Sequence, residues 1–452
     1  MPYKLRILSP LHIGCGEEYN AVSYLMDRRR KPYIINKIND DILFDCLDAN
    51  QKSNFVRWIE SCSDFNLFYF FKNELNDKYF SLQNKIQRNS LYAIPYYGVD
   101  EKIGRNINSF IKQMNHPYVP GSEIKGAIRT AILYYILREN KDNKIFSFLK
   151  DFGMHHKREI ELVKNKSNLR EVNPSNSKQT LASIKKSLEK SISEISQQFQ
   201  IEILNPCGNG DAKYDVMKYL TVGDSELMEA NEVLAVSYLE PFKTSNPGSK
   251  KFRIYNEFMR PENTVSLTAL SIESNNSRTQ KMEKMGFTDC QKQIVAGMDF
   301  IQEACFRFSS ELLQEEIDYF KRQSKPSLVQ HLEGLASQNS KASPIFRIGK
   351  DEGFNSLTVG MAIKKMAPDL YSKVLIHATK GKSYESEFPK SRKIIQWNGK
   401  ELTAGWVQLV HDDGPTLHQS NSDTINTKKP QKGTYNLDLS GLKNKFEGKG
   451  RK

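Results

Sequence analysis

The feature that most constrains the fold is an amphipathic helix that opens directly after a turn. The run Val119–Gly121 ends an extended segment, and from Ile124 to Tyr135 apolar residues recur every three or four positions. This spacing predicts a helix with one face in the core. Ser122 is suited to cap its N-terminus, because a serine side chain accepts hydrogen bonds from the first free backbone amides.

Strand-like segments surround this helix, and a similar order returns in the second half of the chain. A short strand, a break at Ser9-Pro10 and a second short piece ending at Gly14–Gly16 are predicted first, followed by a hairpin formed by 21–26 and 33–36. Further strands are expected at 219–222, 231–238, 264–270, 345–348, 394–397 and 406–410, and a long helical region at 288–322. Strands, a helix and strands, twice over, predict a tandem pair of α+β modules.

Composition and spacing divide the chain further. We expect an N-terminal module over 1–245, with helical insertions at about 37–115 and 140–215, and a C-terminal module over 246–413. The second insertion carries a narrow apolar seam from Leu181 to Phe199. The segment 414–452 holds eight Lys and Arg against three Asp and Glu and has few apolar residues, which predicts a flexible basic tail.

The overall charge points to an anionic partner. The 452 residues include 66 Lys and Arg against 53 Asp and Glu, a net charge of +13, and nucleic acid is the most common partner of such a chain. No apolar run reaches the roughly 18 residues of a membrane helix, and the N-terminus does not resemble a secretory signal. The six cysteines are scattered without a C-x-x-C pair. These features predict a cytoplasmic protein with no metal, no cofactor and no membrane contact.

The first two turns of the helix carry residues that oppose local stability. Lys125 places a cation near the positive end of the helix dipole, and Arg129 follows one turn later on the same face. Gly126 costs about 1 kcal/mol relative to alanine. A phosphate at the helix N-terminus would explain all three residues. An ordinary core helix with a solvated basic face is an equally open interpretation.

Four segments together resemble a known family. The run YVPGSEIKGAIRTAIL resembles the signature of the RAMP superfamily of CRISPR systems. ILSPLHIGCGEEY (7–19), DVMKYLTVGDSE (215–226) and FRIGKDEGFNSLTVG (346–360) resemble its first strand and glycine turn, a mid-chain segment and its C-terminal glycine-rich loop. Their order is most similar to the subunit family at the crRNA 3′ end of the type III-A Csm effector complex. This resemblance implies two ferredoxin-like, RRM-type modules with helical insertions.

The glycine loop and His12 each allow more than one interpretation. Gly349 and Gly353 frame a loop that lacks a nucleotide-binding motif, so it is either a tight turn, with Ser356 capping the next helix, or an RNA-backbone contact through Arg347 and Lys350. His12 lies out of phase with Leu11 and Ile13, which predicts a side chain that points away from the core. Metal-free RNA cleavage would need a second acid or base beside His12, and none is placed there by the sequence. We therefore assign no catalytic residue.

The resemblance implies a non-catalytic RNA-binding subunit that caps the Csm backbone filament, contacts the 3′ part of the crRNA and supports its 3′ maturation in antiviral defence. Its implied partners are crRNA, neighbouring Csm backbone subunits and a housekeeping 3′ trimming nuclease. An endoribonuclease using His12 or Asp224, and a protein-only scaffold, are the alternatives. The residues expected to contact RNA are Gly121, Ser122, Lys125, Gly126, Arg129, His12, Gly14, Arg347, Gly349, Lys350 and Gly353.

Overall fold

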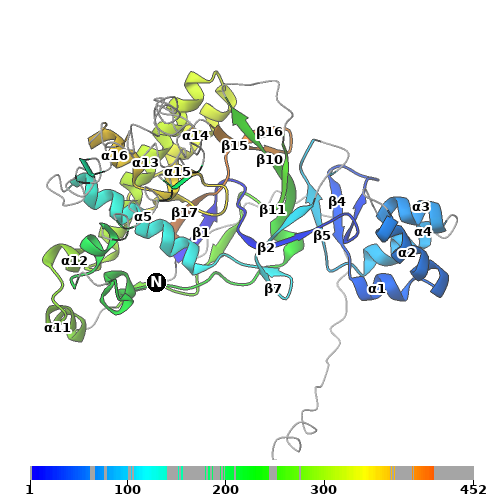
Figure 1. Ribbon diagram of the computed structural model, residues 1–452, viewed down its shortest axis with the longest axis horizontal. Coiled ribbons are helices and arrows are strands. Elements are labelled where there is room, and N and C mark those ends of the chain that lie inside the picture. Colours follow the sequence, from blue (N-terminus) through cyan, green and yellow to red (C-terminus); the bar gives the residue numbers. More distant parts are fainter. Residues whose placement is uncertain are drawn as a thin grey trace, which may run out of the picture. The chain divides into compact units, whose positions relative to one another are not determined.

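Strands from the two ends of the chain lie side by side in one antiparallel sheet. In the computed structural model, β1 (Tyr3–Ile7) pairs with β17 (Trp406–His411) (Figure 1). The strands β12 (Thr264–Ser266) and β14 (Ile345–Arg347) complete the order β12-β1-β17-β14. The structure describes residues 3–61, 67–75, 79–99, 103, 106–139, 199–207, 210–243, 252–273, 276–366 and 391–411, with scattered single positions between them. The predicted basic tail and most of the apolar seam lie outside the described residues.

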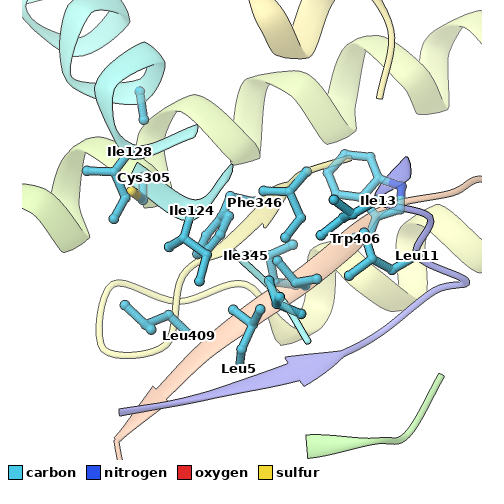
Figure 2. Packing of buried hydrophobic residues seen from close by; sticks show 14 of the residues in the cluster. Leu5, Leu11, Ile13, Ile124, Ile128, Cys305, Ile345, Phe346, Trp406 and Leu409 are labelled. Atoms are coloured by element: carbon cyan, nitrogen blue, oxygen red, sulfur yellow. The ribbon is translucent and has the colours of Figure 1, made fainter. Parts of the chain in front are cut away.

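Two long helices form the core with this sheet. Helix α5 (Gly121–Glu139) packs against α13 (Met298–Arg322), and Ile124 and Ile128 of α5 lie in one cluster with Cys305, Phe346 and Trp406 (Figure 2). All five side chains are buried, and burying a large apolar side chain contributes about 1.5–3 kcal/mol. The helix predicted from the spacing of apolar residues is confirmed, as is the α+β class.

A second, larger sheet of nine strands carries most of the remaining strands. Its main path is β2-β6-β11-β10-β5-β4-β3, and β15 and β16 extend from β10. The bounds are β2 (Gly14–Tyr19), β3 (Tyr24–Asp27), β4 (Tyr33–Lys37), β5 (Tyr92–Tyr96), β6 (Ile107–Phe110), β10 (Leu234–Lys243), β11 (Ile254–Met259), β15 (Ser391–Trp397) and β16 (Lys400–Leu402). The predicted hairpin is confirmed as β3 and β4. Strands from both sides of residue 245 pair in this sheet, and the division into modules there stays a prediction.

Short helices and strands complete the fold. The first part of the helical insertion predicted at about 37–115 forms α1 (Asp40–Asp45), α2 (Ala49–Ser61), α3 (Leu67–Leu75) and α4 (Tyr79–Arg88), which enclose a core of their own around Phe55 and Phe70. The second part is not helical, since it holds β5, β6 and β7 (Lys112–Gln113). The other elements are β8 (His116–Pro117), η2 (Ala212–Tyr214), η3 (Val216–Tyr219), β9 (Leu220–Val222), α10 (Ala230–Val233), β13 (Leu270–Ile272), α11 (Asn276–Lys284), α12 (Asp289–Ile294), α14 (Pro326–Gln338), α15 (Phe354–Leu357) and α16 (Gly360–Met366). Among the described residues, no helix is long and apolar enough to cross a membrane.

Four sequence-based boundaries are wrong. Residues 231–233 belong to α10 and not to a strand, and the strand predicted at 264–270 is two short strands, β12 and β13, in different sheets. The segment Gly14–Gly16 begins strand β2 instead of ending a strand, because Leu11 makes only an isolated bridge to Met259 before the chain turns into the larger sheet. The helical region predicted at 288–322 is two helices, α12 and α13, since the chain is extended at Gly297.

A buried carboxylate anchors the interior of the larger sheet. Glu257 of β11 has no exposed surface, and its Oε1 accepts hydrogen bonds from the Tyr19 and Tyr92 hydroxyls at 2.9 and 2.8 Å. Its Oε2 accepts the Phe110 amide at 2.8 Å and is paired with the Lys112 ammonium. Four donors from separate strands therefore offset the cost of burying this charge.

We expect Lys112→Met to lower the free energy of unfolding by about 3 kcal/mol, because it leaves the buried Glu257 carboxylate without its cation. Chemical denaturation measures this change. The matched control is Lys321→Met, since Lys321 forms an exposed pair with Glu333 and its loss should cost less than about 1 kcal/mol. Equal effects of the two substitutions would contradict the role of Glu257 as an anchor.

Candidate nucleic-acid interface

The N-terminus of α5 is capped from a distant part of the chain. The Gly121 amide donates to Asp224 Oδ1 at 2.8 Å, and a Cβ added at Gly121 would lie 2.4 Å from the Val222 carbonyl oxygen. Only glycine therefore fits at this contact. Ser122 is the second residue of the helix and is exposed, so the prediction that it caps the helix is wrong. Asp224 supplies the acceptor instead.

The two cations of the predicted phosphate site have partners within the protein. Lys125 Nζ donates to the Leu220 carbonyl at 2.8 Å, and burial lowers the pKa of Lys125 while Asp215 opposes that shift. Arg129 Nη1 lies 2.8 Å from Asp215 Oδ2, and its Nε donates to Gln200 Oε1 at 3.3 Å. These contacts fix the direction of both side chains. An ammonium has three donors and a guanidinium five, so each retains donors beyond these bonds.

Packing gives no reason for the glycine at position 126. Gly126 is exposed, and a Cβ added there would meet no atom of the described residues within 4 Å. Alanine would fit the same position and favour the helix by about 1 kcal/mol. A smooth backbone surface at this point suits the close approach of a ligand.

The glycine-rich loop is tied to the segment that precedes β2. Gly349 has a φ of +93°, and a Cβ added there would lie 2.4 Å from the His12 carbonyl oxygen. The same oxygen accepts the Lys350 amide at 3.1 Å. A Cβ added at Gly14 would lie 3.1 Å from His12 Nε2 and 3.8 Å from Lys350 Cδ. The structure thus brings His12 and Gly14 next to Gly349 and Lys350, two predicted site residues that follow more than 300 positions later in the sequence.

The His12 ring lies inside the protein, contrary to the expectation that it points away from the core. It is 2% exposed, and its Nδ1 lies 2.7 Å from the Glu257 carbonyl oxygen, so Nδ1 must carry the hydrogen. Burial lowers the pKa of His12. Its Nε2 is buried without a partner among the described residues. The periodicity argument failed because His12 lies in an irregular segment and not in a strand.

Arg347 is also buried and serves the fold. Its Nε donates to the Ala404 carbonyl at 2.7 Å, and its guanidinium lies 5.1 Å from the centroid of the Trp406 ring. Arg347 is therefore not available to an RNA strand at the surface. Lys350, by contrast, is exposed, and none of the described residues accepts a hydrogen bond from its ammonium.

The end of the glycine-rich loop meets α5. Gly353 has a φ of +83° and precedes α15, which packs on α5 together with α16 (Figure 1). Burial raises the pKa of Glu352 from 4.5 to about 8; Arg347 opposes this rise, and Glu123 in the first turn of α5 adds to it. Ser356 lies inside α15 and donates to the Glu352 carbonyl, so the prediction that it caps this helix is wrong.

These contacts place the first signature, the helix signature and the glycine-rich loop around one region of the molecule. Ser122, Gly126 and Lys350 are exposed there, and Lys125 and Arg129 are partly exposed. Sequence reasoning missed the Asp224 cap, the Asp215 partner and the Glu257 network. The segment 215–226 did give a signal for the first two, since it resembles a family segment ending in Asp-Ser.

Comparisons with known proteins identify the family of this chain. Residues 4–328 match the family model of the RAMP superfamily. The chain belongs to the RAMP superfamily. It is 31% identical over 175 residues to the CRISPR system Cms protein Csm5 of Methanocaldococcus jannaschii, which covers 36% of this chain and 38% of that relative. It is 26% identical over 170 residues to the protein of the same name from Streptococcus thermophilus, which covers 35% of this chain and 44% of that relative.

Solved structures extend the likeness to most of the chain. A chain of a Csm–crRNA–target RNA ternary complex in a type III-A CRISPR-Cas system has a TM-score of 0.60 at 20% identity, covering 90% of this RAMP chain and all of that one. The crystal structure of T. onnurineus Csm5 gives 0.55 at 21% identity, with 89% and 99% covered. This likeness confirms the predicted ferredoxin-like fold with helical insertions.

The raised pKa of Glu352 predicts a pH effect on stability. The folded protein holds a proton on Glu352 up to about pH 8, whereas the unfolded chain releases it above about 4.5. The stability contributed by this group is therefore full below about pH 4.5 and is lost as the pH rises through about 8. Glu352→Gln should flatten the fall of the unfolding free energy over that window, as measured by chemical denaturation.

The exposed Glu232→Gln is the control for this measurement, because that side chain lies at the surface of α10 and its substitution should leave the slope unchanged. The slope of the unfolding free energy against pH could also be the same in Glu352→Gln as in the unsubstituted protein. That result would mean that Glu352 ionises at the same pH in the folded and unfolded states.

Proposed function

We propose that this RAMP chain is a non-catalytic RNA-binding subunit of a type III-A CRISPR interference complex. In this role it caps the backbone filament at the 3′ end of the crRNA and supports crRNA 3′ maturation by a separate trimming nuclease, as part of antiviral defence. Its partners are then crRNA and the neighbouring Csm backbone subunits. The names of the two relatives and the likeness to a chain of a Csm–crRNA–target RNA complex support this proposal.

The observation that carries the proposal is the convergence of the signature segments on one region. The loop around Lys350 is hydrogen-bonded to His12 and meets α5, whose first turns present Lys125 and Arg129 beside the open surface of Gly126. Cations along a surface with little side-chain obstruction suit an RNA backbone, which brings one negative charge per nucleotide. The likeness of fold over about nine tenths of the chain supports the proposed membership of such a complex.

The ribonuclease alternative has less support from the geometry. A general base must reach the proton that it abstracts, and His12 Nε2 is buried while Nδ1 is bonded to the Glu257 carbonyl. Asp224, the other candidate catalytic residue, caps α5. Both groups have a structural explanation, and we propose that RNA is bound here and not cut.

The test is binding of the purified chain to single-stranded RNA across a salt series. Lys350→Ala should weaken binding at low salt and reduce the slope of log K against log salt by about one, because one phosphate contact is lost. Lys284→Ala, which removes an exposed cation at the end of α11, is the charge-matched control and should preserve the slope. Equal losses in the two variants would mean that only net charge matters, and no binding at all would favour the protein-only scaffold.

A further inference from the structure

A pocket of about 380 Å³ opens beside α5, next to the proposed RNA surface. Arg129 and Asp215 form one side of it, and the helical segment 199–204 forms another through Gln200, Ile201 and Leu204. A volume of this size is within the range of small-molecule sites. None of the functions considered so far uses this pocket.

The lining of the pocket has no net positive charge to bind a phosphate. Among the described residues that line it, Arg129 and Asp215 carry the charges, and they neutralise each other across 2.8 Å. The remaining lining residues are amides, aliphatic side chains and a glycine. A neutral ligand with both polar edges and apolar faces fits such a lining better than an anion does.

The geometry of the walls suits a flat ring. The Arg129 guanidinium is held at two points, by Asp215 at Nη1 and by Gln200 at Nε, so its plane is fixed. Guanidinium planes and aliphatic side chains such as Ile201 and Leu204 are surfaces on which unpaired bases pack. Gly210 has a φ of +69°, and a Cβ added there would lie 3.4 Å from Ile201 Cδ1, so glycine keeps this part of the wall open.

The lining holds three amides, Gln197, Gln200 and Asn205, and Gln200, which is bonded to Arg129, keeps a donor for the edge of a ring. Asn205 is occupied on both ends, since its Nδ2 donates to the Asp211 carbonyl at 3.2 Å and its Oδ1 accepts the Cys207 amide at 2.8 Å. Gln200 is bonded to Arg129 through Oε1 only, and its amide nitrogen has no partner among the described residues. That nitrogen is a donor for a carbonyl or ring-nitrogen acceptor.

We propose that this pocket takes one nucleobase turned out of the bound RNA strand, stacked on Arg129 and hydrogen-bonded to Gln200. Arg129 lies one helical turn after Lys125 on the same face of α5, so a strand whose phosphate approaches Lys125 can direct a base into the pocket. The proposal rests on the proposed function and adds to it a contact with a base, whereas Lys350 and Lys125 contact the backbone.

The test compares short single-stranded RNA with an abasic ribose-phosphate strand of the same length and charge. The unsubstituted full chain should bind the RNA about tenfold more tightly than the abasic strand, the typical effect of one stacked base. Ile201→Trp, which fills the pocket, should bring this ratio close to one while leaving affinity for the abasic strand unchanged. Gln200→Ala should lower the ratio in the same direction.

Gln314→Ala is the control, because Gln314 is exposed on α13, away from the lining of the pocket, and donates to Asp318. Equal binding of RNA and abasic strand by the unsubstituted chain would contradict the proposal that the pocket binds a nucleobase. The proposed function would not be affected by that result. A ratio that persists in both Gln200→Ala and Ile201→Trp would also contradict the pocket proposal. Failure to bind either strand would overturn the proposed function, and the pocket proposal with it.

Discussion

The rest of this structure depends on the short segment that joins β1 to β2. Residues 9–13 are buried, so their backbone polar groups must find partners inside the protein. Pro10 accepts the Gly405 amide at 3.0 Å, Leu11 exchanges two bonds with Met259, His12 accepts the Lys350 amide at 3.1 Å, and Ile13 accepts the Ile111 amide at 2.8 Å. These four residues thereby join both sheets and hold the glycine-rich loop in place.

This arrangement explains why the proposed RNA surface can be rigid although it is assembled from loops. The glycine at 349 is required because its neighbour in space is the His12 carbonyl, and Asp224 holds the start of α5 through a single charged acceptor. The cations at the surface are aimed by Asp215 and by the Leu220 carbonyl. Side chains that are oriented before binding lose less entropy when a ligand arrives.

The elements that could be predicted from the sequence are those whose apolar residues recur with a regular local period. The helix over 121–139, the hairpin of β3 and β4 and the last strand were found because apolar spacing reports directly which face of an element is buried. The candidate site was found only in part. The burial of His12 and the partners of Lys125 and Arg129 come from contacts with residues 245, 95 and 86 positions away, which periodicity does not report. The cap of α5 was misplaced for the same reason, since the sequence offered a nearby serine and the fold uses a distant aspartate.

The central claim is that RNA lies across the region where the signature segments meet. Photo-crosslinking of the full chain to single-stranded RNA containing 4-thiouridine, followed by peptide mapping, tests this most directly. Our account predicts crosslinks at Gly14 and within 122–129 and 349–353. Residues 28–31, between β3 and β4, are three arginines and a lysine. Crosslinks confined to that loop or to the tail 414–452, with none in those three places, would contradict our account.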